Sequence, residues 1–401
     1  MSALAVRRLL VARALRAFAD GFVSLLLPLH LLSLGLTPFQ VGAIATATLL
    51  GSGLLTLVVG LRASRIGSRA LLTAAAILMC ATGLGFATLS SFWPLLVLAI
   101  VGTLNPSSGD VSVFLPLEHA VLARSVRDDS RTAAFARYSL VGSLAGACGA
   151  LFAGTPQLIA ASLGIELRGL YPWMFVLYAL LGLLAGAIYR GLPAATAVDV
   201  APSAPLERSK RIVYTLAALF SLDAFGGGFL VQSLLALWLY EKFQLSIAVA
   251  GTIFFWTGVL SAFSYLVAAR IARRIGLVNT VVFTHLPANV LLLVMPFAPD
   301  LWWVIVLLLV RSALSQMDVP TRSSYVMAVV TPSERPAAAS ITSVPRSLAS
   351  AVSPVVAGYL LGLSAFGWPL IVAGAVKIAY DLALLATFRA VRPPEETALQ
   401  P

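Results

Sequence analysis

Eight ionisable side chains lie inside long apolar stretches of this 401-residue sequence. At the centre of a membrane each such side chain costs about 2.5–3.5 kcal/mol on insertion scales. We therefore expect these groups to form ion pairs, to carry protons or to bind a polar ligand. Five are acidic and three are basic: Asp20, Asp110, Asp223, Asp318, Asp381, Arg311, Arg346 and Lys377.

Two of the acids belong to proline-containing polar motifs at which an apolar run is predicted to break. Residues 105–110 read NPSSGD and end in Asp110, whereas residues 315–320 read SQMDVP and contain Asp318. Proline removes a backbone donor, and exposed backbone at membrane depth is tolerated only where it faces protein or water. We expect the two breaks to mark a functional cavity, with Asp110 and Asp318 as proton carriers and Asp223 as the next candidate. The alternative is a pair of helix kinks whose serines are satisfied internally.

The basic residues are open to more than one role. Arg311 lies two helical turns before Asp318, so it could pair with an acid or hold an anionic solute, and Arg346 has the same two possibilities. Arg16 lies one turn before Asp20 and is expected to neutralise it locally. Lys377 and Asp381 have the same i,i+4 spacing and are expected to form a structural pair.

The patterns of the common enzyme and metal sites are missing from the sequence. It contains no HExxH, GxSxG or phosphate-binding loop, and only three lysines. The histidines, His30, His119 and His285, are far apart and lack the spacing of metal ligands, so we expect them to serve mainly in packing. The missing motifs argue against an enzyme embedded in the membrane. The acids at matching positions of the two halves argue against a receptor that transports nothing. We expect no enzyme activity, metal or cofactor.

The elements that must position these residues are membrane helices. The chain is 60% apolar and only 11% charged, whereas a soluble domain is about a quarter charged. A span needs roughly 20 apolar residues, so the length accommodates about twelve. The apolar runs predict spans at 11–34, 39–61, 70–90, 92–118, 133–155, 170–190, 212–240, 246–269, 276–298, 301–329, 337–362 and 366–389.

The two halves of the sequence resemble each other. GLRASRIG at 60–67 matches ARIARRIG at 269–276, and Asp110-Val111 matches Asp318-Val319 at nearly the same offset. Asp20 and Asp223 both fall early in the first span of a half. We predict an all-α membrane protein of two pseudo-symmetric six-helix halves, 1–190 and 211–401, joined by a cytoplasmic linker at 191–210.

Basic residues are distributed unequally between alternate loops. Nineteen fall in the loops on one side, together with both termini and the linker, against Arg168 and Lys242 on the other. The positive-inside rule then predicts that both termini lie in the cytoplasm. We expect the protein to lie in the inner (plasma) membrane of the cell. The net charge of +11 is explained by basic loops facing anionic lipid, so we expect lipid and not nucleic acid as the partner.

The loop between the second and third spans resembles the signature of the major facilitator superfamily, GxxxD(R/K)xG(R/K)(R/K). Gly60, Arg65, Gly67 and Arg69 match it, whereas serine replaces the acid at position 64 and the first closing basic residue at position 68. In that family the loop helps to close the cytoplasmic side. The resemblance therefore implies a major facilitator fold and a cytoplasmic gate at these four residues.

The resemblance also implies a function. A bacterial, twelve-span permease of the efflux type would act as a monomer that exports a small organic molecule in exchange for protons. Residues 149–154 read GALFAG and only partly match the antiporter pattern GPxxGG. Proton-coupled or facilitated uptake of a small anionic solute, and movement of lipids between leaflets, therefore stay open. The driving force would be the proton gradient, and the substrate site would include Asp20, Asp110, Asp223, Arg311, Asp318 and Arg346.

Overall fold

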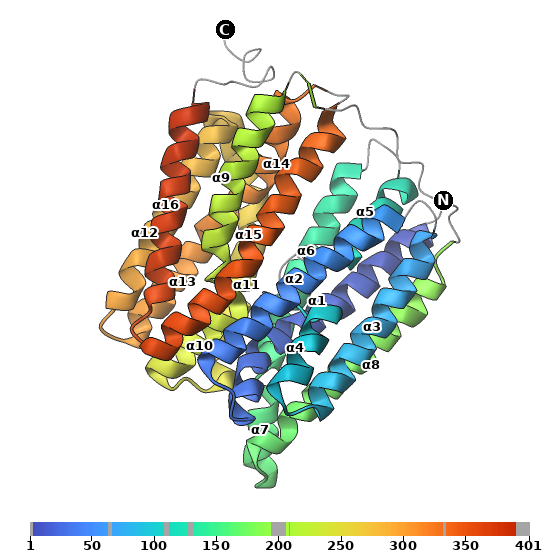
Figure 1. Cartoon of the computed structure of the whole chain (residues 1–401), viewed down its shortest axis with the longest axis vertical. Coiled ribbons are helices and arrows are strands. Elements are labelled where there is room, and N and C mark those ends of the chain that lie inside the picture. The colour runs from blue at the N-terminus through green and yellow to red at the C-terminus, as the bar shows by residue number, and fades with distance from the viewer. Residues whose placement is uncertain are drawn as a thin grey trace. The chain divides into compact units, whose positions relative to one another are not determined.

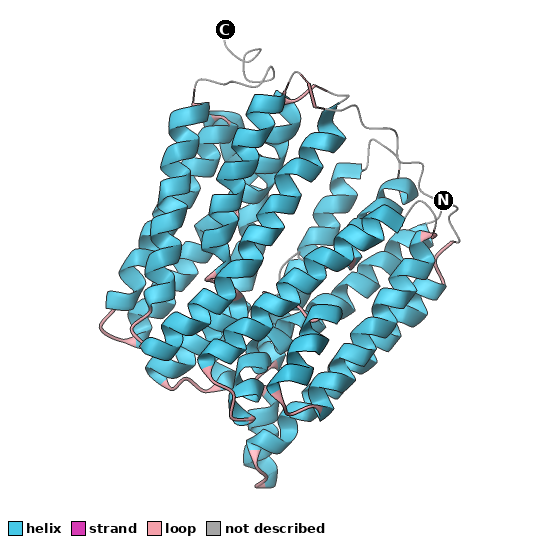
Figure 2. Ribbon diagram, viewed as in Figure 1, coloured by secondary structure: helices cyan, strands magenta, loops and turns pink. Residues whose placement is uncertain are grey.

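A computed structural model describes residues 3–62, 66–107, 112–126, 131–193, 206–207, 209–331 and 334–389. Across these ranges the regular elements are all helices, as Figure 2 shows. The chain forms two compact units, Met1–Asp199 with Val231–Gly258 and Val200–Leu230 with Val259–Pro401. The division into halves at residues 191–210 stays a prediction from the sequence.

The first unit contains the helices drawn from blue to green in Figure 1 and the later segment Val231–Gly258. Within it α1 packs against α6 and α8, and α3 packs against α8. Its helices are α1 (Ala3–Ser33), α2 (Pro38–Arg62), α3 (Ser68–Thr88), α4 (Phe92–Val101), α5 (Phe114–Ser125), α6 (Arg131–Phe152), α7 (Thr155–Leu163), α8 (Tyr171–Arg190), α10 (Gln232–Phe243) and the first turns of α11 (Ile247–Ile275).

The second unit contains the rest of α11 and the helices in which most of the predicted site residues lie. Within it α9 packs against α15 and α16, and α12 packs against α13, α14 and α16. Its other helices are α9 (Lys210–Gly228), α12 (Leu277–Val294), α13 (Leu301–Ser315), α14 (Asp318–Val329), α15 (Arg335–Leu363) and α16 (Trp368–Phe388).

Nine stretches of the described residues are long and apolar enough to cross a membrane. The predicted first, fourth and tenth spans do not meet this standard. The first carries several charges in α1, and the other two are divided into the shorter pairs α4/α5 and α13/α14. Most of the predicted acids thus lie in spans that carry further charges or are divided into shorter helices.

Both predicted helix breaks are present. The fourth span stops at Val101 and resumes at Phe114, and the tenth stops at Ser315 and resumes at Asp318. In the fourth, Thr82 Oγ1 accepts a hydrogen bond from the backbone N–H of Thr103, and Asn105 Oδ1 accepts one from that of Ser107. Side chains therefore satisfy backbone groups that the break releases from helical bonding.

The predicted seventh span at 212–240 is among the nine apolar stretches, within Lys210–Phe243. Residues 229–231 divide it into α9 and α10, a break that was not predicted. Three consecutive glycines, 226–228, end α9, and glycine is a poor helix former because it loses the most backbone entropy on ordering. After this break, the backbone N–H of Ser233 donates a 3.1 Å hydrogen bond to the carbonyl of Pro106 in the broken fourth span.

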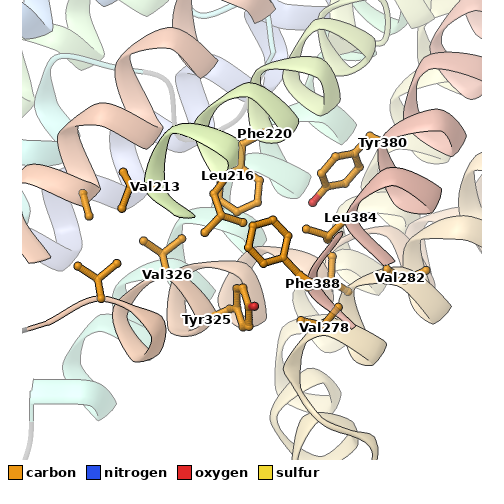
Figure 3. Close-up of a cluster of buried hydrophobic side chains, with 13 residues drawn as sticks. Val213, Leu216, Phe220, Val278, Val282, Tyr325, Val326, Tyr380, Leu384 and Phe388 are labelled. Carbon is orange, nitrogen blue, oxygen red and sulfur yellow. The ribbon is translucent and has the colours of Figure 1, made fainter. Parts of the chain in front are cut away.

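The apolar cluster of the second unit joins five helices (Figure 3). Aromatic rings of α9, α14 and α16 meet there, with Phe220 6.5 Å from Tyr380 and Tyr325 5.9 Å from Phe388 between ring centroids. The cluster consists of Val213, Leu216, Phe220, Val278, Val281, Val282, Tyr325, Val326, Val330, Ala338, Tyr380, Leu384 and Phe388. Burial of these side chains fixes the four helices that carry the polar site described next.

Candidate functional site

Asp223 on α9 lies at the centre of a buried charged network in the second unit. Lys377 Nζ of α16 donates a 2.6 Å hydrogen bond to Asp223 Oδ1, and Arg322 Nη1 of α14 donates one of 2.9 Å to Oδ2. The three side chains are each at most 7% exposed. Ionised groups are costly to remove from water, so they are stable here only because they compensate one another.

Arg322 serves two carboxylates at once. Its Nη1 lies 2.9 Å from Asp223 Oδ2 and 3.3 Å from Asp318 Oδ2. Its guanidinium carbon also lies 5.3 Å from the centroid of the Phe220 ring, within cation–π range. Asp223 and Asp318 therefore compete for one cation, and a change of charge on either alters how tightly Arg322 is held by the other.

The network extends from Asp223 to α12 and to a third carboxylate. His285 Nδ1 lies 2.8 Å from Asp381 Oδ1 and its Nε2 lies 3.8 Å from Asp223 Oδ1. Asn289, one turn after His285, donates a 2.8 Å hydrogen bond from Nδ2 to Asp381 Oδ2. The charged network thus comprises Asp223, His285, Asn289, Asp318, Arg322, Lys377 and Asp381.

The structure corrects two expectations about these residues. Lys377 pairs with Asp223 of another helix and not with Asp381 of its own turn, whereas Asp381 pairs with His285. His285 therefore belongs to a polar network and does not serve only in packing. The sequence analysis also passed over Arg322, although its i,i+4 spacing from Asp318 within an apolar run was a usable signal.

Arg311 and Arg346 act on this network without bonding to it. The positive charges of both are felt by Asp223 and Asp318. The Nε atom of Arg311, in the last turns of α13, is buried without a hydrogen-bond partner. Arg346, midway along α15, has an exposed side chain. Both predicted arginines thus interact electrostatically with the acids, and Arg311 keeps an unused donor, its Nε.

The first unit contains a separate buried cluster around Glu118 of α5. Arg16 of α1 forms a salt bridge with Glu118 Oε2, and Tyr138 of α6 donates a hydrogen bond to the same atom. Tyr189 of α8 donates a 2.6 Å hydrogen bond to Oε1 and accepts one of 2.9 Å from Arg16 Nε. The sequence analysis missed Glu118, which lies at the edge of the predicted fourth span.

Arg16 was expected to neutralise Asp20 locally. Its positive charge does act on Asp20, but its hydrogen bonds go to Glu118 and Tyr189. In the first unit a basic residue of the first span pairs with an acid of the fourth. In the second unit an acid of the seventh span, Asp223, pairs with a base of the tenth, Arg322. The two pairs join corresponding spans at different positions and are opposite in sign.

Asp20 is buried near the broken fourth span. The side chain of Asn105 hydrogen-bonds to it, and the positive charges of Arg13 and Arg16 act on it. Asp110, the predicted proton carrier of the fourth span, lies outside the described residues. Among those described, no group of three or more His, Cys, Asp or Glu side chains has an arrangement that could hold a metal ion.

The predicted cytoplasmic gate is described only in part. Gly60 lies in the last turns of α2, and Arg65 lies outside the described residues. Gly67 precedes α3 with a φ of −59°, so this turn does not require a glycine. Its counterpart Gly276 has a φ of +86°, where glycine is favoured. Arg69 is exposed in the first turn of α3.

Comparison with protein families gives matches along nearly the whole chain. The family model of the Major Facilitator Superfamily matches residues 9–230 and 216–401. A membrane protein of Saccharomyces cerevisiae, uncharacterized YJR124C, is 25% identical over 413 residues, which cover 94% of this chain and 92% of the yeast protein.

Solved transporter structures share the fold. A mutant of the nucleoside transporter NupG superposes with a TM-score of 0.75 at 12% identity, over 96% of this chain and 99% of that one. A bacterial homologue of the human lysosomal transporter Spinster gives a TM-score of 0.75 at 14% identity, over 99% and 98% of the two chains. At such low identity these likenesses concern the fold alone.

Proposed function

Because this chain belongs to the Major Facilitator Superfamily, a family of membrane transporters, we propose that it is a proton-coupled secondary transporter of a small organic solute. Alternating access would move the solute, and the proton gradient would supply the work. The protein is a multi-pass integral membrane protein, and no enzymatic step is needed for this function.

The observation that carries the proposal is the sharing of Arg322 between Asp223 and Asp318. If one carboxylate takes up a proton, it loses its charge and Arg322 is held by the other alone. The ion pairs join α9 to α14 and α16, so protonation changes the contacts between helices. A ligand that binds two conformations with different affinity shifts their populations, and this is what coupling requires.

Direction, location and topology are further parts of the proposal. The partial antiporter pattern at 149–154 favours export in exchange for protons, as in efflux permeases of bacteria. The unequal distribution of basic residues favours an inner (plasma) membrane with both termini in the cytoplasm. In this proposal, Arg65 and Arg69 help to close the cytoplasmic side, and the protein acts as a monomer.

Uptake of an anionic solute is a second candidate, supported by Arg311. The Nε donor of Arg311 is buried without an acceptor, and a buried donor left unsatisfied is costly unless a ligand supplies the acceptor. Arginine suits carboxylate and phosphate groups because its planar fork can bind two oxygens. Arg346 would add a second cation. In this variant of the proposal, the negatively charged group of the solute would pair with Arg311.

The proposal is tested in proteoliposomes with a pH-sensitive dye inside and a panel of cationic, neutral and anionic solutes outside. We expect at least one solute to move protons. Asp318→Asn and Asp223→Asn should each abolish solute-driven proton movement while solute exchange persists, and Asp110→Asn tests the acid outside the described residues. Asp300→Asn is the matched control, since Asp300 is exposed. Normal proton stoichiometry in all three site variants would refute the coupling role.

A further inference from the structure

His285 occupies a position between two carboxylates on different helices. Its ring reaches Asp381 of α16 through Nδ1 at 2.8 Å and faces Asp223 of α9 through Nε2 at 3.8 Å. The side chain is buried, as are both acids. The first distance is that of a hydrogen bond, whereas the second is too long for one.

The partners of His285 determine which ring nitrogen is free to exchange a proton. Asn289 Nδ2 also lies 3.1 Å from Nδ1, but this amide donates to Asp381 Oδ2 at the shorter distance of 2.8 Å. An ionised carboxylate can only accept, so Nδ1 carries the hydrogen that is donated to Asp381. The Asn289 amide donates to the other oxygen of Asp381, which fixes this carboxylate on both sides. The Nε2 atom is then the acceptor left over, and it points at Asp223.

The charges within the network explain what a proton on Nε2 would do. Arg322 and Lys377 supply two positive charges that pair with Asp223 and Asp318. Asp381 is paired with His285, so a protonated His285 would supply a positive charge beside that acid. It would also place a new cation beside Asp223 Oδ1, the atom that Lys377 already contacts at 2.6 Å.

The surroundings of His285 leave few other groups that could take this role. Lys377 and Tyr380 face it from α16, with the Tyr380 ring centroid at 6.0 Å, and Arg322 and Asp318 belong to α14. Arg311 of α13 and Arg346 of α15 act on the same acids from a distance. One turn away along α9, α12 and α16, the apolar cluster of Figure 3 closes one side of the network.

We propose that His285 is a further proton-binding residue of the second unit beside Asp223 and Asp318, and that a proton on its Nε2 weakens the hold of Asp223 on Lys377 and Arg322. This inference rests on the proposed proton coupling. The proton comes from water on one side, binds the Nε2 lone pair and leaves to water on the other side. An imidazole gains a positive charge when it binds a proton, so loading of His285 changes the charge beside both carboxylates.

The first test observes the proton directly and does not depend on transport. The chain has only three histidines, so ¹⁵N labelling of histidine in full-length protein in lipid nanodiscs gives three ring systems. The His285 signal is identified as the one that is absent from the spectrum of the His285→Gln variant. In the wild-type protein its Nε2 should titrate between pH 5 and 9, while Nδ1 stays protonated. Asp381→Asn and Asp223→Asn should each move the midpoint to lower pH by about one unit, since a nearby carboxylate favours the imidazolium.

Two outcomes of this measurement would overturn the proposal. One is a His285 signal that does not titrate in that range, and the other is a midpoint that neither acid variant moves. The wild-type titration decides the first point even if His285→Gln folds poorly. In that case Tyr380→Phe, which removes a hydroxyl without a hydrogen-bond partner, perturbs the neighbouring signal and identifies it.

The second test separates this inference from the proposed function. In proteoliposomes His285→Gln should lower solute-coupled proton movement at least tenfold, whereas solute exchange persists. His30→Gln, in the first unit, is the matched control and should behave as wild type. Normal proton coupling in His285→Gln rejects the inference and leaves the proposed function standing. If wild-type protein moves solute without protons, the proposed function fails and the His285 coupling role fails with it, even where the titration is seen.

Discussion

Lys377 Nζ on α16 lies 2.6 Å from Asp223 Oδ1 on α9, with both side chains buried. This bond joins two helices that already pack against each other, and Gly226 of α9 lies against the stem of Lys377. A larger residue at position 226 would displace this stem. Close helix packing therefore determines where the ammonium group is placed.

Removing one partner of this pair should cost more than removing both. Lys377→Met leaves Asp223 with one cation fewer, and loss of one partner of a buried ion pair costs about 3–5 kcal/mol. In Lys377→Met/Asp223→Asn we expect an unfolding free energy higher than the two single losses predict, by about 1–3 kcal/mol. Thermal unfolding of the four proteins in detergent measures this coupling. Additive losses would show that the pair is not energetically coupled.

Glu118 should be a main stabilising residue of the first unit. It accepts hydrogen bonds from Arg16, Tyr138 and Tyr189, which lie on three different helices. Glu118→Ala leaves the buried Arg16 without its counter-ion, and we expect a loss of about 3–5 kcal/mol, visible as a lower midpoint of thermal unfolding. Glu166→Ala removes an exposed carboxylate and should change the midpoint little. Equal midpoints for the two variants would contradict this role.

Arg311 should matter for binding and not for stability. Its Nε forms no hydrogen bond, so Arg311→Gln breaks no bond that involves this atom. We expect thermal stability to change little, since the charge of Arg311 interacts with Asp223 and Asp318 without a direct ion pair. If the solute is anionic, its affinity should fall at least tenfold, measured by binding to purified protein. Unchanged affinity for every anionic solute in the panel would remove Arg311 from the substrate site.

The sequence predicted the helical class and the places where polar groups enter the membrane. Apolar run length predicts spans, and proline-containing polar motifs predicted the breaks near Pro106 and Asp318, because these features act locally. The break after Gly228 was missed although three glycines precede it. The reason for that break includes a neighbouring helix, since the carbonyl of Ser350 leaves no room for a side chain at position 228.

The partners within the site could not be predicted in the same way. Spacing along one helix suggested that Lys377 pairs with Asp381 and Arg16 with Asp20, but the chosen partners lie 154 and 102 positions away. Such bonds depend on which faces of distant helices meet. No short pattern in a single sequence indicates which helix faces meet. The presence of a charged residue inside an apolar run, in contrast, can be read directly from the sequence.

Gly149 should be required for the contact between α1 and α6. A Cβ atom at this position would overlap the carbonyl oxygen of Phe18, and a Cβ at Gly21 would overlap that of Gly146. Both clashes are with backbone, which cannot move aside as a flexible side chain does, so we expect Gly149→Ala to destabilise the protein by about 1–3 kcal/mol. Gly53→Ala in α2 meets no atom within 4 Å and is the matched control. Because alanine favours a helix over glycine by about 1 kcal/mol, the control should be neutral or stabilising in thermal unfolding. A Gly149→Ala variant as stable as the control would mean that α1 and α6 can separate without cost, and that the close approach is not what holds the first unit together.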